Sequence, residues 1–381
     1  MNSALAATPA TRPADVVDLA ALTRGIGIDP RIPATVPGFD APFFQAGLAG
    51  YSDGAMRVVA REHGCPYCVT EALLDRTLLA GGVGKRREDP DLLERGAHAR
   101  GETGGRDHPI AGQVIGSEPD EMARAAIALA ELGYETIDVN LACPVKKIKN
   151  KGRGGHLLAD PERGVAILAA VRRALPASIP TSAKLRRGFD DGPDSPRRFE
   201  RVFHAAYDLG YAWTTVHART VAQKYVGPSD WTFLARLVEA HPDRLVFGSG
   251  DVWDAADIFR MLRATGVAAV SVARGCIGNP WIFRQARAML AGEVPRAPTI
   301  DEQRRVLLRH LALSVALHGE PVAARMMRKF GIMFSRHHPR AARVKEAFIA
   351  CADLDDWRRV CDREYTATPA EMPETTPVLA L

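Results

Sequence analysis

The feature that most constrains this fold is a regular alternation of short apolar segments with amphipathic helical patterns between residues 42 and 273. Eight segments have the length and flanking turn residues of buried strands. They are PFFQAG (42–47), CVTE (68–71), PIAGQVIG (109–116), TIDVN (136–140), PTSAKL (180–185), WTTVH (213–217), LVFGSG (245–250) and AAVSVA (268–273). This count predicts an α/β fold, a (β/α)8 TIM barrel. The alternative is a doubly wound open sheet, but AGLAGYSD follows the first strand where that fold carries G-x-G-x-x-G.

The helical pattern continues beyond the last strand and predicts a second, C-terminal all-helical domain. The stretch GEVPRAPT is a natural linker into it. We expect an N-terminal extension (1–38) with one short helix, a catalytic barrel domain (39–290), a helical domain (291–365) and a tail (366–381). A long polar segment, 81–108, interrupts the barrel pattern and is typical of a lid or a disordered loop.

The composition is that of a soluble globular protein, with 46% hydrophobic and 25% charged residues among 381. No segment approaches the roughly 20 apolar residues of a membrane span, and the N-terminus lacks the pattern of a secretory signal. We therefore expect a cytoplasmic protein with no membrane partner. Six cysteines are too few for a disulfide framework. Cys65 and Cys68 form one CxxC, which could be a redox pair or half a zinc site, although buried structural thiols are the favoured interpretation.

Basic residues are concentrated in two runs, although the formal net charge is only +5. The segment 141–159 holds five basic residues and no acid, among them Lys146 and Lys147. The segment 321–345 holds seven and no acid, among them Arg325, Arg328 and Lys329. One such run usually marks a solvated face. Two runs, one near the expected strand ends and one on the helical domain, favour contact with nucleic acid.

Polar residues occur at the ends of nearly all the later strands. The C-terminal strand ends of a barrel meet at one mouth, where active sites lie. Polar groups are costly to bury without partners, so we expect these residues to face a ligand. They are Gln113, Asn140, Cys143, Lys184, His217, Arg219, Ser249, Asp251 and Arg274, and Gly250 lies between two of them at the end of the seventh strand. The glycine-rich turns FGSGDVW and ARGCIGNPW predict a phosphate-binding site, because small residues let backbone N–H groups approach an anion.

Cys143 follows the fourth strand, in DVNLACPVKK. It could be a nucleophile, a metal ligand or a proton donor. No Cys or His lies at ligand spacing around it, so we expect no metal. A thiol with a reference pKa of about 8.5 can donate a proton at neutral pH.

Seven ordered motifs together resemble the dihydrouridine synthase family, from Gln45 to about Trp357. They are LAGYSD (48–53), QVIGS (113–117), DVNLACPVKK (138–147), KLRRGFDD (184–191), HARTVAQKYVGPSDW (217–231), GSGDV (248–252) and ARGCIGNPWIF (273–283), and ARMMRKF (324–330) fits in the helical domain. The resemblance implies a cytoplasmic flavoprotein, an FMN-dependent oxidoreductase of tRNA processing that reduces uridine to 5,6-dihydrouridine with NADPH. We expect it to be a monomer.

The resemblance also implies roles for individual residues. Reduced FMN would deliver hydride to C6 of the uracil, and Cys143 would protonate C5. Cofactor-binding residues would be Gly47, Leu48, Ala49, Gln113, Lys184, His217, Ser249, Gly250, Asp251, Ala273 and Arg274. The uracil would be held by Asn140, Lys184, His217 and Arg219, and the RNA by Lys146, Lys147, Arg325, Arg328 and Lys329.

Four residues depart from the family's usual wording, and all four are small. Gly47 stands where proline is common, Ala142 where glycine precedes the cysteine, Ser249 where asparagine is common, and Ala273 where glycine precedes the arginine. We interpret them as marks of a divergent subgroup with a different target uridine. The alternatives are an FMN-barrel reductase of a free pyrimidine or other small molecule, an enzyme acting on ribosomal RNA, and an RNA-binding protein that has lost catalysis.

Overall fold

The computed structural model describes residues 19–80, 106–144 and 152–366. Its centre is a closed barrel of parallel strands, in the order β2-β1-β9-β8-β7-β6-β5-β4-β3, which the pairing of β2 with β4 closes. The TIM-barrel prediction is therefore confirmed. The strands are β1 (Phe43–Gln45), β2 (Cys68–Val69), β3 (Leu73–Leu74), β4 (Ile110–Ile115), β5 (Thr136–Leu141), β6 (Thr181–Arg186), β7 (Trp213–His217), β8 (Val246–Ser249) and β9 (Ala269–Val272).

Each of the eight expected strands is present, and only β3 was not expected. Both β2 and β3 pair with β4, so together they fill one position of the barrel. The interruption between them places Thr70 beside β4, where its Oγ1 accepts a hydrogen bond from the Gln113 N–H at 2.9 Å.

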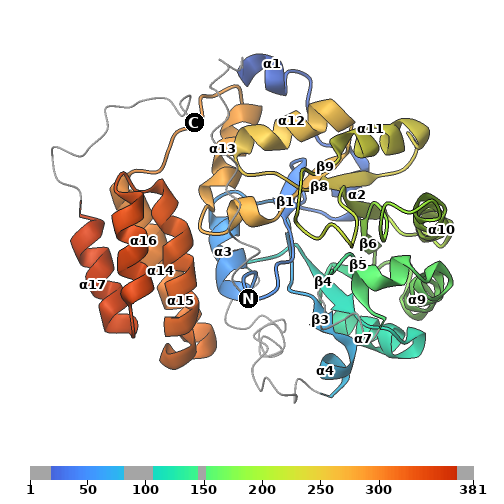
Figure 1. Ribbon diagram of the computed structural model, residues 1–381, viewed down its shortest axis with the longest axis horizontal. Helices are drawn as coiled ribbons and strands as arrows, with labels where there is room; N and C mark the ends of the chain where they lie inside the picture. Colours follow the sequence, from blue (N-terminus) through green and yellow to red (C-terminus); the bar gives the residue numbers. More distant parts are fainter. Residues whose placement is uncertain (1–18, 81–105, 145–151, 367–381) are drawn as a thin grey trace.

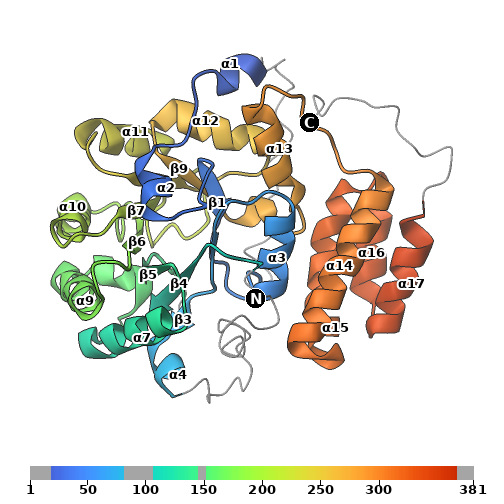
Figure 2. The same ribbon diagram turned by 180° about the vertical axis from the view of Figure 1, so that it is seen from behind.

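Helices cover the outside of the barrel (Figures 1 and 2). Four of them begin at an aspartate, Asp53, Asp160, Asp230 or Asp254, whose side chain accepts a hydrogen bond from the N–H three residues later. Such caps satisfy donors that the first helical turn leaves unpaired. The helices are α3 (Gly54–Glu62), α4 (Asp75–Leu79), α7 (Pro119–Glu131), α9 (Pro161–Ala174), α10 (Ser195–Asp208), α11 (Trp231–Ala240), α12 (Ala255–Thr265) and α13 (Trp281–Leu290).

The N-terminal end of the barrel is closed by aromatic rings, which we call the floor: Phe39, Phe44, Tyr67, Trp213 and Phe247, all at most 2% exposed. Phe39 stacks on Tyr67 with centroids 4.6 Å apart, and Trp213 stacks on Phe247 at 5.1 Å. The segment before β1, which contains α1 (Leu19–Thr23) and α2 (Arg31–Thr35), packs against this floor through Ile32 and Val36. This part of the expected extension therefore contributes to the core.

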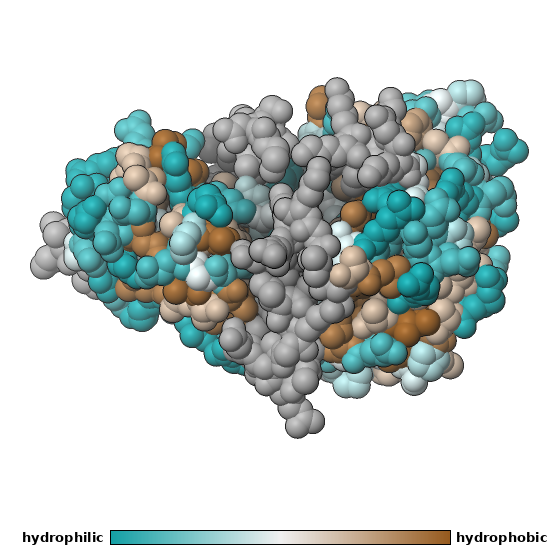
Figure 3. Space-filling model, turned by 90° about the horizontal axis from the view of Figure 1, so that it is seen from below, coloured by the Kyte–Doolittle hydropathy of each residue, from teal (hydrophilic) through white to brown (hydrophobic). Residues whose placement is uncertain are grey.

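Four further helices form the helical unit: α14 (Ile300–His318), α15 (Glu320–Phe334), α16 (Ala341–Ala350) and α17 (Leu354–Glu364) (Figure 1). A reciprocal capping box of Thr299 and Glu302 starts α14. The helical pattern of the sequence runs without a break through residues 341–365, but this segment forms two helices, because Asp353 caps the second through the Asp356 N–H. Figure 3 shows the molecule from below the view of Figure 1, and on this face hydrophilic residues cover much of both the helical unit and the barrel. The domain boundaries stay predictions.

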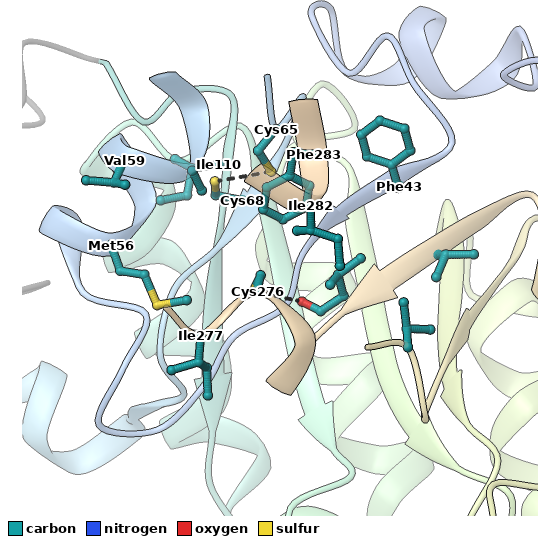
Figure 4. Close-up of a cluster of buried hydrophobic side chains, with 14 of the residues drawn as sticks. Phe43, Met56, Val59, Cys65, Cys68, Ile110, Cys276, Ile277, Ile282 and Phe283 are labelled. Carbon is teal, nitrogen blue, oxygen red and sulfur yellow. Dashed lines mark hydrogen bonds between the residues drawn. The ribbon is translucent and has the colours of Figure 1, made fainter. Parts of the chain in front are cut away.

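Cys65 and Cys68 lie among buried apolar side chains, including Phe43, Ile110 and Phe283 (Figure 4). Their sulfur atoms are 3.9 Å apart, and the Cys65 thiol donates to the Tyr67 carbonyl. Within the described ranges, no group of three His, Cys, Asp or Glu side chains could hold a metal ion. The same ranges contain no helix long and apolar enough to cross a membrane.

Candidate active site

The strand register brings the predicted polar residues together around the mouth. Gln113 lies opposite Asp138, Asn140 opposite Lys184, Arg186 opposite His217, and His217 opposite Ser249. Side chains two residues apart on a strand point to the same face. At the mouth, the inward-facing residues of β4 to β8 therefore form a continuous polar wall.

A hydrogen-bond network connects this wall to the loop of Cys143. The Gln113 side chain donates to Asp138 Oδ2 at 2.7 Å and accepts from Asn140 Nδ2 at 2.7 Å. Asn140 Oδ1 in turn accepts the backbone N–H groups of Ala142 and Cys143, both at 3.0 Å. Asn140 thus fixes the direction in which the chain leaves β5, and with it the place of the thiol.

Cys143 lies at the C-terminal end of β5 and is partly exposed. Its carbonyl accepts the Gly155 N–H at 3.1 Å. At Gly154, a Cβ would lie 3.1 Å from the Cβ of Cys143. The two glycines therefore allow the start of the 3₁₀-helix Gly154–Leu158 to pack directly against the cysteine.

Two charged groups inside the wall have perturbed pKa values. Burial lowers the pKa of Lys184 to about 8, and the nearby Asp138 carboxylate offsets part of that effect. Burial raises the pKa of Asp138, opposed by hydrogen bonds from Ser182 and Gln113. An ammonium group with a pKa near 8 is mostly protonated at neutral pH and can donate to a carbonyl oxygen.

The far side of the mouth carries a cluster of cations around one carboxylate. Arg219 donates to both oxygens of Asp251 at 2.7 Å, and Arg274 lies 3.6 Å from the same carboxylate. The Arg219 guanidinium is 3.2 Å from His217 Nε2. Burial, followed by the charges of Arg186 and Lys184, holds the pKa of His217 well below its usual value, so this imidazole is neutral at pH 7. Two guanidiniums share one carboxylate, which leaves an excess positive charge.

Glycines at the mouth allow close approach of backbone segments. At Gly47, a Cβ would lie 2.3 Å from the Thr70 carbonyl oxygen, so no larger residue fits this backbone. Gly250 has a φ of +117°, and a Cβ there would lie 2.3 Å from Ser229 Oγ. Ser249 is buried, Leu48 and Ala273 are partly exposed, and Ala49 is exposed. These predicted cofactor residues therefore come from the ends of β1, β8 and β9, whereas Gln113, Lys184 and His217 come from β4, β6 and β7.

The charges and shapes of these residues fit a ligand that carries a phosphate. The excess charge of Arg219 and Arg274 beside glycine turns suits an anionic phosphate. A cavity within the barrel is lined by Gly47, Gln113, Asp138 and Lys184, with apolar Phe44 and Val69 nearby. Such a mixture of apolar walls and a few convergent polar groups is typical of ligand sites.

The predicted RNA-binding residues have different surroundings. Arg325 and Arg328 are exposed on α15. Lys329 on the same helix donates to the Gly50 carbonyl oxygen, and its ammonium lies 4.4 Å from the centroid of the Tyr51 ring. Lys146 and Lys147 lie outside the described residues. All five roles stay predictions.

The sequence analysis did not select Asp138 and Arg186, although both belong to the wall. Arg186 is 1% exposed and donates to the carbonyls of Ala142, Thr220 and Lys224 at 2.8, 2.9 and 2.7 Å. It thereby joins the cysteine loop to the loop after β7. The signal was present, because both residues lie two positions from a selected residue on the same strand.

The chain matches the family model described as Dihydrouridine synthase (Dus) over residues 44–369. A protein of Xanthomonas axonopodis pv. citri named tRNA-dihydrouridine synthase B is 32% identical, covering 84% of this chain and 91% of the relative. A probable tRNA-dihydrouridine synthase of Treponema pallidum is 33% identical, covering 77% and 84%. A tRNA-dihydrouridine(16) synthase of Aquipseudomonas alcaligenes is 35% identical, covering 69% and 80%.

Among solved structures, a histamine dehydrogenase from Rhizobium sp. 4-9 has a similar fold. The TM-score is 0.50 at 14% identity, and the match covers 70% of this chain and 49% of the dehydrogenase. This chain thus corresponds to about half of that protein. At this identity the similarity is one of fold alone.

Proposed function

The chain belongs to the dihydrouridine synthase family, and from this premise we propose that it reduces uridine in tRNA to 5,6-dihydrouridine, using FMN as cofactor and NADPH as electron donor. The observation that carries the proposal is the convergence of Gln113, Asn140, Lys184 and His217 on one wall next to Cys143. This wall joins fixed hydrogen-bond donors to a partly exposed thiol. We further propose that the protein acts as a cytoplasmic monomer.

Each side chain has a defined task in this proposal. Reduced FMN bound at the mouth would supply the hydride for C6 of the uracil. Lys184, Asn140, His217 and Arg219 would hold the uracil edge. The Lys184 ammonium would polarise a carbonyl while electron density builds on the ring. The Cys143 thiol would give its proton to C5, and Asn140 would keep that thiol in place through the two backbone N–H groups.

A second set of residues, opposite those that hold the uracil, would bind the cofactor. Gly47, Leu48 and Ala49 would line it, and Gln113 and Lys184 would contact its ring. Ser249, Gly250, Ala273 and Arg274 would surround its phosphate-bearing arm. Asp251 would orient the guanidiniums of Arg219 and Arg274 rather than contact an anion itself, since it already accepts from one and lies beside the other.

The helical unit would bind the RNA backbone. A uridine inside folded RNA must leave its stack to reach a buried site, at a cost of a few kcal/mol. Contacts to phosphates can offset that cost. The exposed Arg325 and Arg328 on α15 suit this task, and Lys146 and Lys147 are proposed to act beside the mouth.

The test is to offer three substrates to the FMN-loaded, NADPH-reduced protein. They are unmodified tRNA, unmodified ribosomal RNA and free uridine, with dihydrouridine measured by mass spectrometry. We expect product in tRNA. Faster reduction of free uridine would make the protein a small-molecule reductase, and product in ribosomal RNA alone would change its substrate. A protein that takes up no FMN and reduces none of the three would be a binding protein without catalysis.

A further inference from the structure

The loop between β1 and α3, residues 46–53, is held by two different parts of the molecule. On the barrel side, the Gly50 N–H donates to Glu71 Oε2 at 2.5 Å. Within the loop, Ser52 Oγ accepts the Leu48 N–H at 2.7 Å. Gly47 packs directly against the Thr70 carbonyl, where a Cβ would not fit. The loop therefore has a closely fitted inner face at the mouth.

On its other side the loop contacts the helical unit. Lys329 on α15 donates to the Gly50 carbonyl oxygen, and its ammonium lies 4.4 Å from the Tyr51 ring centroid. The Tyr51 ring meets Phe330 edge-on, with centroids 5.7 Å apart. A cation over an aromatic face is attracted to the ring, and more strongly where water is excluded.

A second anchor lies at the end of the same loop. His318, the last residue of α14, places Nε2 2.8 Å from Asp53 Oδ2, and both side chains are only 2% exposed. Asp53 also caps α3 by accepting the Met56 N–H at 3.0 Å. Burial raises the pKa of Asp53, but the His318 hydrogen bond and the charge of His310 more than offset this and hold it below its usual value. The loop and α3 thus depend on a partner that is 265 positions away in the chain.

We propose that Lys329 is a positioning residue for the cofactor loop, so that the helical unit completes the FMN site without touching the cofactor. The inference rests on the proposed function in one respect, namely that FMN binds beside Gly47–Ala49. Lys329 fixes the carbonyl of Gly50, the residue that follows Ala49. Loss of that contact frees the Gly50 carbonyl, leaves only the Tyr51–Phe330 and Asp53–His318 contacts between the loop and the helical unit, and lowers the affinity of the mouth for FMN.

The test compares FMN affinity in apoprotein of the full chain, measured by quenching of flavin fluorescence without RNA. Lys329→Met keeps the aliphatic stem and removes the ammonium. We expect its Kd for FMN to rise about tenfold, which is within the range of a lost cation–π contact. Lys345→Met is the matched control, since it removes an exposed ammonium from α16 of the same unit and is expected to leave the Kd unchanged. Lys329→Arg, which retains a cationic donor, should recover most of the affinity.

The possible results separate this inference from the proposed function. A Kd of Lys329→Met within twofold of the wild type, with or without a lower Tm, overturns the positioning role and leaves the proposed function intact. Wild-type apoprotein that takes up no FMN overturns both.

A measurement on the wild type decides the matter if Lys329→Met does not fold. FMN added to the apoprotein should slow amide hydrogen exchange both in residues 46–53 and around Lys329 in α15. Slowing that is confined to the barrel would overturn the inference.

Discussion

The floor and the mouth are the two ends of one barrel and are built from opposite kinds of side chain; β7 runs from Trp213 at the floor to His217 at the mouth, and β8 from Phe247 to Ser249. At the floor, Phe39 stacks on Tyr67 and Trp213 on Phe247, the two pairs meet edge-on, and no charge is buried. At the mouth, Asp138, Lys184 and Arg186 are largely removed from water at a cost that hydrogen bonds only partly recover. The residues at the start of a strand therefore stabilise the protein, and those at its end form the candidate active site. Substitutions at the floor should lower stability, whereas substitutions at the mouth should lower turnover.

The largest expected effect comes from the mouth. Cys143→Ala should lower dihydrouridine formation on the order of 10²- to 10⁴-fold, the usual contribution of a positioned acid. The side chain is partly exposed and small, so the Tm and the FMN content should change little. Single-turnover assays with reduced protein and tRNA measure the loss. Turnover within tenfold of the wild type would remove the proton-donor role.

The corresponding change at the floor is Phe247→Ala. Phe247 is fully buried among Phe39, Phe44 and Trp213, so its truncation should lower the free energy of unfolding by about 3 to 5 kcal/mol. Urea titration measures this loss. Turnover per folded molecule should stay within about twofold of the wild-type value. The milder Phe247→Leu should have a free energy of unfolding between those of the wild type and Phe247→Ala. A large loss of turnover with unchanged stability would abolish the distinction between floor and mouth.

His310 is a buried polar residue outside the mouth, and we expect it to affect the pH dependence of stability. It is 1% exposed, packs on Phe330, and its ring nitrogens have no hydrogen-bond partner among the described residues. Burial lowers its pKa to about 4. Because the folded-state pKa lies below the unfolded value of about 6.5, acid protonates the unfolded chain first, and stability is lost as the pH falls from about 6.5 towards 4.

From this group alone, we expect the wild type to be about 2 kcal/mol less stable at pH 5 than at pH 8. His310→Leu should lose that part of the acid sensitivity. Urea titration of both proteins at the two pH values measures the difference. Equal acid losses in the two proteins would show that His310 is not responsible.

RNA binding should depend on charges remote from both ends of the barrel. The double variant Arg325→Glu, Arg328→Glu should bind tRNA about tenfold more weakly, with a shallower salt dependence, since phosphate contacts release counterions. NADPH oxidation should not change. Lys329 is left intact because it contacts Gly50. Arg236→Glu on the exposed face of α11 is the control, and an equal loss in that variant would show a general effect of net charge.

The smallest effect is a change in a pH profile. With the pKa of Lys184 at about 8, turnover should decline as the pH rises above that value, by about five- to tenfold from pH 8 to 9, because the donor proton is lost. Lys184→Arg should move this decline to higher pH, whatever its absolute rate. A profile of the same shape in both proteins would assign the decline to another group.

The sequence predicted the barrel well because period and length constrain a strand strongly. It did not predict β3, since a two-residue strand such as Leu73–Leu74 has no period of its own. Nor did it predict that 341–365 breaks into two helices, where one cap at Asp353 outweighs a continuous helical pattern.

At the candidate site, the polar residues selected because they lie at predicted strand ends are neighbours in the structure, since the register of β4 to β8 places them side by side. Asp138 and Arg186 were missed because each was treated as part of a motif and not as an inward-facing position. The contact of Lys329 with Gly50 could not be predicted, since a lysine in a basic run has the same local pattern whether it faces solvent or a carbonyl 279 positions away.

The register of β5 against β6 has a consequence for how this protein can change over evolutionary time. Inserting or deleting a single residue inside β5 would turn Val139 towards the cavity and send Asp138 and Asn140 towards the outer helices. Loops around the barrel can change in length during evolution, whereas β5 and β6 tolerate substitutions but no insertions or deletions. Ungapped spacing from residue 138 to 143 and from 182 to 186 is therefore a stricter criterion than percentage identity for finding distant relatives that retain the same chemistry.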